Sequence, residues 1–134
     1  MAEMADGETS GTETAVAADA AAGALAYLTE MSPDLRGGAI LATDGTVLAA
    51  SGQADRWRED VATLFAVADR AGEEPVEQLH VGTEQGEVFA LRHEGLAAAV
   101  VADRFALASL LFFDMRSILR DLAAGGDGRG RDAT

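Results

Sequence analysis

Two apolar segments that lack polar alternation constrain the fold more than any other feature of this sequence. GAILAT (38–43) and LAAAVVA (96–102) suit β-strands, and neither offers a polar face to water. An antiparallel strand with one solvated face normally alternates between apolar and polar residues. We therefore expect a sheet that is covered by helices on both faces.

Hydrophobic spacing predicts three helices and five strands. Apolar residues recur at three- and four-residue steps over 15–31, over 55–71 and from 103 to about 124, which is typical of helices with one buried face. Short turns join most of the extended runs, so the sheet is expected to be antiparallel. The predicted fold is a three-layer α/β/α sandwich of the mixed α/β (α+β) class. Its element order is α-β-β-α-β-β-β-α, with the middle helix on one face and the other two helices on the opposite face. The expected strands cover Ala39–Thr43, Thr46–Ser51, Val76–Val81, Glu87–Arg92 and Leu96–Val101.

Local signals indicate where these elements begin and end. The pair Asp44 and Gly45 suits the positive φ angles of a type I′ turn, so we expect a tight hairpin between the first two strands. Asp55 and Asp103 each precede a helical segment and are expected to cap its N-terminus. The glycines at 125–126 are expected to end the last helix.

The chain of 134 residues is expected to hold one domain. Residues 1–14 mix Gly, Ser, Thr and acids with little to bury, which predicts a disordered acidic leader. The domain is expected over 15–124 and a flexible tail over 125–134. The apolar run 105–113 is shorter than the roughly 20 residues that cross a bilayer as a helix. The acidic N-terminal stretch does not indicate export, so we expect a cytoplasmic protein.

Composition argues against several kinds of chemistry. The sequence has no cysteine, and all ten basic residues are arginine. Thiol nucleophiles, lysine Schiff bases and a phosphate-loop lysine are therefore excluded. A net charge of −13 would repel a nucleic-acid backbone. We expect no nucleic-acid partner, no cofactor and no enzymatic activity of the chain's own.

The titratable residues do not form a recognisable metal or acid-base site. His80 and His93 lie thirteen residues apart, with no further ligand at suitable spacing. Glu73, Glu74 and Glu77 bunch before the third strand, whereas a general acid-base pair would face each other across a pocket. We expect structural or exposed histidines, solvated acids and no bound metal.

A continuous stretch around the first hairpin carries a resemblance to a known family. It runs from Pro33 through two glycines and an apolar run to Leu41, continues into the Asp-Gly turn and ends with VLAASG at 47–52. This stretch and the element order over about 21–123 resemble the roadblock/LC7 family, which includes MglB-like proteins and dynein light chains of the roadblock type. The resemblance implies a profilin-like sandwich.

The resemblance also implies a homodimer. In this family the strand corresponding to 76–81 pairs with its copy across a two-fold axis, and the helix corresponding to 55–71 packs against its copy. Small or apolar residues off the inward stripe of that helix fit this arrangement, with plain helix propensity as the alternative for the alanines. His80 would then lie near its own copy, and its protonation below about pH 6.5 is expected to weaken the pairing. The expected interface residues are Ala62, Ala66, Val67, Val76, Gln78, Leu79, His80 and Val81.

Functionally, the resemblance implies a non-catalytic regulator or scaffold of a Ras-like small GTPase, within a bacterial signalling module. The expected partner contacts are Arg56, Trp57 and Arg58 in the second helix and Asp44 in the hairpin. Plain surface charge is the alternative for the arginines, and an arginine finger is a further one. Two other functions stay open: a scaffold in a sensor-kinase complex without effect on GTP hydrolysis, and a small-molecule sensor, which would need an internal pocket.

Overall fold

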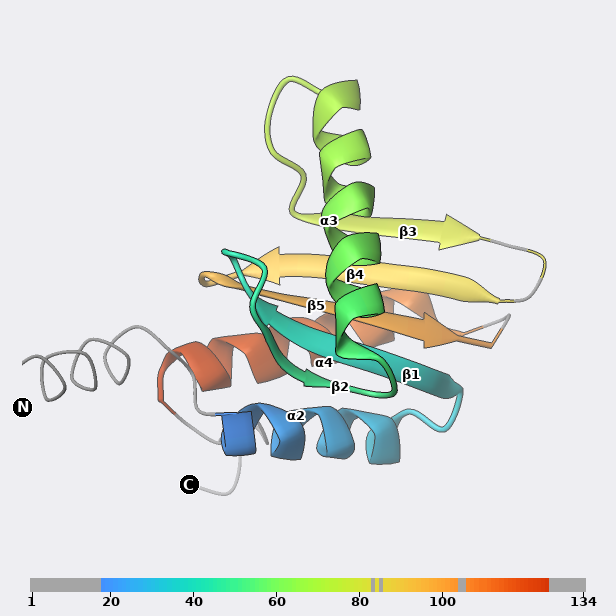
Figure 1. Ribbon diagram of the computed structural model, residues 1–134. Helices are drawn as coiled ribbons and strands as arrows, with labels where there is room; N and C mark the ends of the chain where they lie inside the picture. The colour runs from blue at the N-terminus through green and yellow to red at the C-terminus, as the bar shows by residue number, and fades with distance from the viewer. Residues whose placement is uncertain (1–17, 83, 85, 104–105, 126–134) are drawn as a thin grey trace, which may run out of the picture.

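The computed structural model describes residues 18–82, 84, 86–103 and 106–125 (Figure 1). The expected leader, the tail beyond Gly125 and the first three residues of the first expected helix lie outside the described residues. Within them, three helices and five strands follow in the predicted order. They are α2 (Ala18–Met31), β1 (Leu35–Ala42), β2 (Val47–Ala50), α3 (Ala54–Ala71), β3 (Gln78–Gly82), β4 (Glu87–His93), β5 (Leu96–Ala102) and α4 (Ala108–Ala123).

The five strands form one antiparallel sheet in the order β2-β1-β5-β4-β3. β5 lies at the centre, because it pairs with β1 on one side and with β4 on the other. Val100 of β5, for example, lies opposite Gly38 of β1 and Phe89 of β4. β2 and β3 are therefore the two edges of the sheet.

Helices cover both faces of the sheet, as the apolar strands predicted. Figure 1 shows α3 crossing one face, while α2 and α4 lie against the other. The α/β/α sandwich with a five-stranded antiparallel sheet is confirmed. The core beneath α2 and α4 is the larger one and includes Leu28, Ile40, Phe89, Met115 and Leu119. The core beneath α3 includes Leu41, Val61, Phe65, Ala90 and Ala99.

Gly38 allows α2 to lie close to the sheet. A Cβ atom at this position would be 2.9 Å from Cγ1 of Val100 and 3.1 Å from Cδ1 of Leu25, which are shorter than ordinary van der Waals contacts. This glycine of the GGAIL run is therefore required by packing. α2 ends at Met31, before Pro33, as the sequence predicted.

The turn between β1 and β2 differs from the prediction. Gly45 has a φ of +96°, but Asp44 has no positive φ, so the predicted type I′ turn is wrong. The N–H of Gly45 donates to the oxygen of Ala42 (3.0 Å), and the N–H of Ala42 donates to the oxygen of Thr46 (2.8 Å). This pattern is typical of a type I turn followed by a glycine bulge. Two consecutive positive φ angles occur instead at Glu94–Gly95, between β4 and β5.

The two predicted helix caps are also wrong. The N-cap residues are Gln53 for α3 and Leu107 for α4, and neither makes a side-chain capping hydrogen bond. Asp55 lies two positions beyond Gln53, in the first turn of α3, where a carboxylate still interacts favourably with the helix dipole. Asp103 lies before α4 and forms an ion pair with Arg36 at 2.9 Å.

β3 begins at Gln78, two residues later than predicted. Val76 lies before the strand, and its N–H donates to the carboxylate of Asp69 at 2.8 Å. Its carbonyl oxygen accepts a hydrogen bond from Nε of Arg92 at 2.8 Å. The backbone of Val76 is therefore bound to side chains of α3 and β4, and Val76 is not part of the edge strand.

Candidate interaction surface

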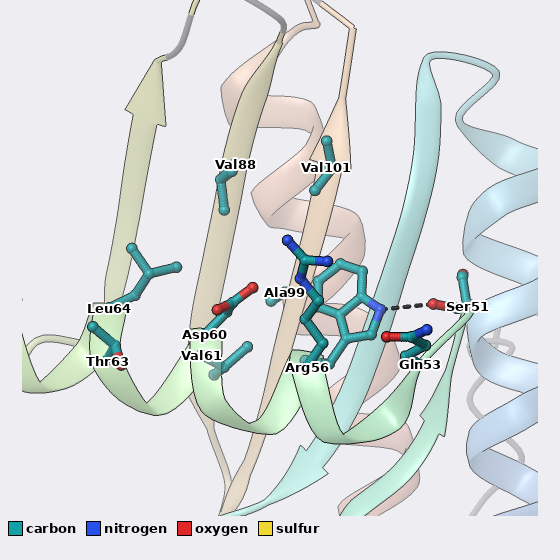
Figure 2. A pocket seen from close by; sticks show the side chains of 11 residues that line it. Ser51, Gln53, Arg56, Asp60, Val61, Thr63, Leu64, Val88, Ala99 and Val101 are labelled. Carbon is teal, nitrogen blue, oxygen red and sulfur yellow. Dashed lines mark hydrogen bonds between the residues drawn. The ribbon is translucent and has the colours of Figure 1, made fainter.

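A groove of about 650 Å³ lies between α3 and the face of the sheet that this helix only partly covers. We call it the α3 groove. Figure 2 shows Asp60 and Leu64 on the helix side and Val88 and Val101 on the sheet side. Arg56 extends from the first turn of α3 over the same groove (Figure 2). The groove therefore combines apolar walls with charged residues of both signs.

Trp57 fixes the N-terminal end of α3 to the first hairpin. Its indole Nε1–H donates to the carbonyl oxygen of Ser51 at 2.7 Å. A Cβ atom at Gly37 would lie 3.7 Å from Cζ2 of the indole, so the ring packs over this glycine of β1. The half-buried Trp57 is therefore a structural anchor as well as a wall of the α3 groove.

The two arginines beside Trp57 differ in their surroundings. Arg58 forms an ion pair with Asp55 at 2.6 Å. Arg56 is exposed, and none of the ion pairs found within the described residues involves it. Arg56 is therefore the guanidinium of the α3 groove that is available to a partner.

The structure places the remaining predicted contacts on the other side of α3. A second cavity of about 340 Å³ is lined there by Gly45, Arg58, Ala62 and Ala66. Asp44 lies in the adjoining turn and accepts the N–H of Thr46 at 2.8 Å, a hydrogen bond that lowers the pKa of this carboxyl. The four predicted partner contacts thus divide between the two sides of the helix: Arg56 and Trp57 line the groove, whereas Arg58 and the hairpin flank the second cavity.

Arg92 of β4 is a central residue of this face that the sequence did not reveal. Its guanidinium donates to both carboxylate oxygens of Asp69, at 2.7 and 3.2 Å, and lies 4.2 Å above the ring of Phe65. It also binds the carbonyl oxygen of Val76. The hydrogen bonds from Arg92 and from the N–H of Val76 lower the pKa of Asp69. The contacts of Arg92 with Asp69 and Phe65 fix the C-terminal half of α3 to the sheet. The signal in the sequence is faint: one arginine at the end of an apolar strand and one aspartate in a helix.

The β3 edge is open to solvent along its outer side. The N–H of Arg92 donates to the oxygen of Glu77 at 2.7 Å. Because backbone groups in an antiparallel pair face the partner strand at every second residue, Leu79 and Val81 also direct their backbone groups toward β4. The outward backbone groups therefore belong to Gln78, His80 and Gly82.

The two faces of β3 carry different side chains. On the α2/α4 face, His80 stacks on Phe89 with a centroid distance of 4.3 Å, and its Nε2 lies 2.6 Å from a carboxylate oxygen of Glu87. On the α3 face, Leu79 packs against the smaller core and Val81 is 38% exposed. Val67 of α3 is 52% exposed. Exposed apolar side chains therefore occur both on α3 and on the edge strand.

No other kind of site is evident in the part of the chain that the structure describes. There, no three His, Cys, Asp or Glu side chains are grouped so that they could hold a metal ion. Nor does any described helix have the length and apolar character needed to span a membrane. The α3 groove and the β3 edge are therefore the features on which a functional argument can rest.

Comparison with known proteins identifies the fold. No family profile and no curated protein sequence matches the chain. Among solved structures, a roadblock/LC7 domain from Streptomyces avermitilis is 23% identical, with a TM-score of 0.62, and the match covers 76% of this chain and 90% of that one. The gliding protein MglB from Thermus thermophilus is 15% identical, with a TM-score of 0.69 and coverage of 84% and 98%. MglB from Myxococcus xanthus is 14% identical, with a TM-score of 0.51 and coverage of 76% and 83%. The chain therefore has the roadblock/LC7 fold.

Proposed function

We propose that this protein is a non-catalytic homodimer that regulates or scaffolds a Ras-like small GTPase. The observation that carries the proposal is the roadblock/LC7 fold together with an α3 face that one subunit covers only in part. The GTPase follows from the family resemblance in the sequence, because fold alone does not specify a partner.

Three features of the α3 face support a homodimer. The β3 edge has unpaired outward backbone groups, and exposed edges of this kind commonly pair with another chain. Val67 and Val81 expose apolar surface beside that edge. Figure 1 also shows the last turns of α3 extending past β3, beyond the sheet of its own subunit. A second copy that pairs through β3 would bring its own sheet beneath those turns.

The partner contacts lie at the N-terminal half of α3 and the first hairpin. Arg56 and Trp57 line the α3 groove, and Arg58 lies beside Gly45 across the helix. These residues are far from the β3 edge along the sheet order, so a dimer leaves the hairpin region of both subunits accessible. A two-fold dimer then offers a GTPase a surface with two equivalent halves.

The GTPase part of the proposal is tested by timing phosphate release. A Ras-like GTPase from the same organism is loaded with GTP, and single-turnover hydrolysis is followed as the concentration of this protein is raised. A regulator binds and changes the rate. A stable complex with an unchanged rate would instead support the scaffold function. If neither a complex nor a rate change is found, the proposal is wrong.

Arg56→Ala separates a docking role from an arginine finger. A finger contributes about 10³-fold or more to the rate at saturation. We expect instead a higher half-saturating concentration with a nearly unchanged maximal rate, because Arg56 is proposed as a binding contact. Arg120→Ala, on exposed α4 surface across the sheet, is the matched control and should change neither quantity.

The dimer is tested by sedimentation at micromolar concentration with two variants of one residue. His80→Pro removes an outward N–H that β4 does not use, so the sheet of the subunit should persist while pairing is lost. His80→Thr removes the same imidazole but keeps the N–H, and it should remain a dimer. Circular dichroism confirms that both variants are folded. A monomeric wild-type protein, or a dimeric folded His80→Pro variant, would contradict β3 pairing.

A further inference from the structure

The sheet side of the α3 groove is an apolar strip that α3 does not cover. Val88 of β4 and Val101 of β5 lie directly opposite each other on these two strands, and both are half-buried. We call this pair the valine strip. Gly37 of β1 is the next residue in the same row, and the indole of Trp57 packs over it. The strip therefore has room for an apolar group, with an aromatic wall at its β1 end.

Two opposite charges extend over this strip without neutralising each other. Arg56 and Asp60 both line the groove, and Figure 2 shows both side chains pointing from α3 toward the valine strip. Residues four positions apart on a helix are close enough to form an ion pair. None of the ion pairs within the described residues joins these two, whereas Asp55 and Arg58 of the same helix do pair. Both charged groups therefore remain available to a ligand.

Charge complementarity then selects the class of ligand. An anion would be attracted by Arg56 and repelled by Asp60, and a cation would meet the reverse. A purely apolar molecule would displace water from both charged groups and replace none of its hydrogen bonds. A zwitterion with an apolar body satisfies both charges and covers the strip. An α-amino acid with a large apolar side chain has this chemistry.

The size and the remaining lining of the groove fit such a ligand. Its volume of about 650 Å³ lies in the range of roughly 300–1,000 Å³ that is typical of small-molecule sites. Leu64 adds apolar surface on the helix side, and Ser51, Gln53 and Thr63 add hydrogen-bonding groups. The groove is larger than one amino acid, so water can bridge the ligand to these polar side chains.

We propose that the α3 groove binds a free α-amino acid with a large apolar side chain. Its carboxylate binds Arg56, its ammonium group binds Asp60, and its side chain lies on the valine strip against Trp57. This binding requires no other protein. Arg56 and Trp57 are also the proposed GTPase contacts, so an occupied groove would compete with the GTPase. That consequence rests on the function set out under Proposed function, whereas the binding itself does not.

Trp57 provides the signal for a direct test, because it is the one tryptophan of the sequence and lines the groove. The purified protein is titrated with L-leucine and with L-phenylalanine while tryptophan emission is recorded, and calorimetry repeats each titration independently. We expect a saturable change with both ligands. Glycine should bind at least about tenfold more weakly than leucine, because it has no side chain to bury on the strip.

Leucine analogues that lack one charge identify which residue binds which group. 4-Methylpentanoate lacks the ammonium group, and 3-methylbutylamine lacks the carboxylate. Each should bind the wild-type protein about fivefold more weakly than leucine. Asp60→Asn should bind leucine and 4-methylpentanoate almost equally, and Arg56→Gln should bind leucine and 3-methylbutylamine almost equally. A merely structural effect of either substitution would not remove the matching preference.

Matched controls remove one charge of each sign on the far side of the sheet. Arg120→Gln on α4 and Glu30→Gln on α2 change exposed residues there and should bind leucine like the wild type. Circular dichroism confirms that all variants are folded. The absence of a saturable signal up to about 10 mM leucine would overturn the proposal.

Two further results would also overturn it. One is an unchanged analogue preference in both groove variants, Arg56→Gln and Asp60→Asn. The other is tryptophan emission that changes with protein concentration but not with amino acid, because a second copy of the chain would then occupy the groove. None of these results alters the outcome of the phosphate-release assay with the GTPase, so failure of the amino-acid site and failure of the proposed function are distinguished.

Discussion

The two faces of the sheet differ in how completely one subunit covers them. On the α2/α4 face, seven residues of α4 are buried, and Phe89, Met115 and Leu119 have no exposed surface. On the other face, α3 is longer than α4, yet only Val61 and Phe65 of its residues are buried. The first face is a complete core within one subunit, whereas on the second face most of α3 stays exposed. Stability should therefore reside mainly on the α2/α4 face and recognition on the α3 face.

The largest expected effect follows from truncating a side chain of the complete core. Phe89 is fully buried, stacks on His80 and meets Phe112 edge-on at 5.4 Å. Phe89→Ala should lower the free energy of unfolding by about 3–5 kcal/mol, because it removes apolar contacts and leaves a cavity. Urea unfolding at fixed protein concentration measures the change. Phe89→Leu should cost clearly less.

The comparison is sharpened by Leu64→Ala on the α3 face. Leu64 is half-buried and lines the α3 groove. In the isolated subunit its truncation should cost less than about 1 kcal/mol. For the GTPase proposed to bind at the α3 groove it should raise the Kd by about tenfold, because this side chain lines the groove. An unfolding cost like that of Phe89→Ala, with an unchanged Kd, would contradict the division between the two faces.

An intermediate effect concerns the acid stability of the α3 face. Hydrogen bonds from Arg92 and then from Val76 lower the pKa of Asp69 below its ordinary value of 3.8. A carboxyl with a lowered pKa stabilises the folded state at pH values above its ordinary pKa. This contribution is lost as the pH falls through the lower pKa of the folded state. Asp69→Asn should therefore reduce stability at pH 6 and flatten its decline below about pH 4.

Asp44 provides the matched comparison for this measurement. Its pKa is also lowered, by the backbone N–H of Thr46, but it lies in the hairpin turn and binds no side chain of the sheet. Asp44→Asn should flatten the decline of stability over the same acid range. It should leave the position of α3 unchanged. If Asp69→Asn shows the pH dependence of the wild type, the pair with Arg92 does not act as described. Urea unfolding from pH 7 to pH 3 distinguishes these outcomes.

The layers of the fold could be predicted because they depend on residue patterns within single segments. The runs around Ile40 and Val100 have no polar face, so helices on both sides were required. The first turn could not be predicted in the same way. An Asp-Gly pair is compatible with more than one hairpin turn, and the choice depends on the register between β1 and β2, which shifts between Ile40 and Leu41.

The candidate site was only partly predictable, for a related reason. Arg56 and Trp57 follow from their position at the start of an amphipathic helix. The pair formed by Arg92 and Asp69 joins residues 23 positions apart, and it depends on where α3 crosses the sheet.

The smallest expected effect concerns His80 at the proposed β3 seam, where its side chain lies on the α2/α4 side of the edge strand. Protonation of His80 alone was expected to weaken pairing by placing two positive charges near the axis. In the structure, Nε2 of His80 lies 2.6 Å from Glu87 of the same subunit, and Arg116 is held nearby by its hydrogen bond to Gln78. Glu87 therefore places a carboxylate beside each imidazole within its own subunit, which opposes repulsion between the two copies across the axis. Between pH 8 and pH 5.5 the Kd of the wild-type dimer should rise by less than about threefold, whereas that of Glu87→Gln should rise by about fivefold or more. Sedimentation equilibrium at the two pH values measures both, and equal responses of the two proteins would show that Glu87 does not compensate the charge.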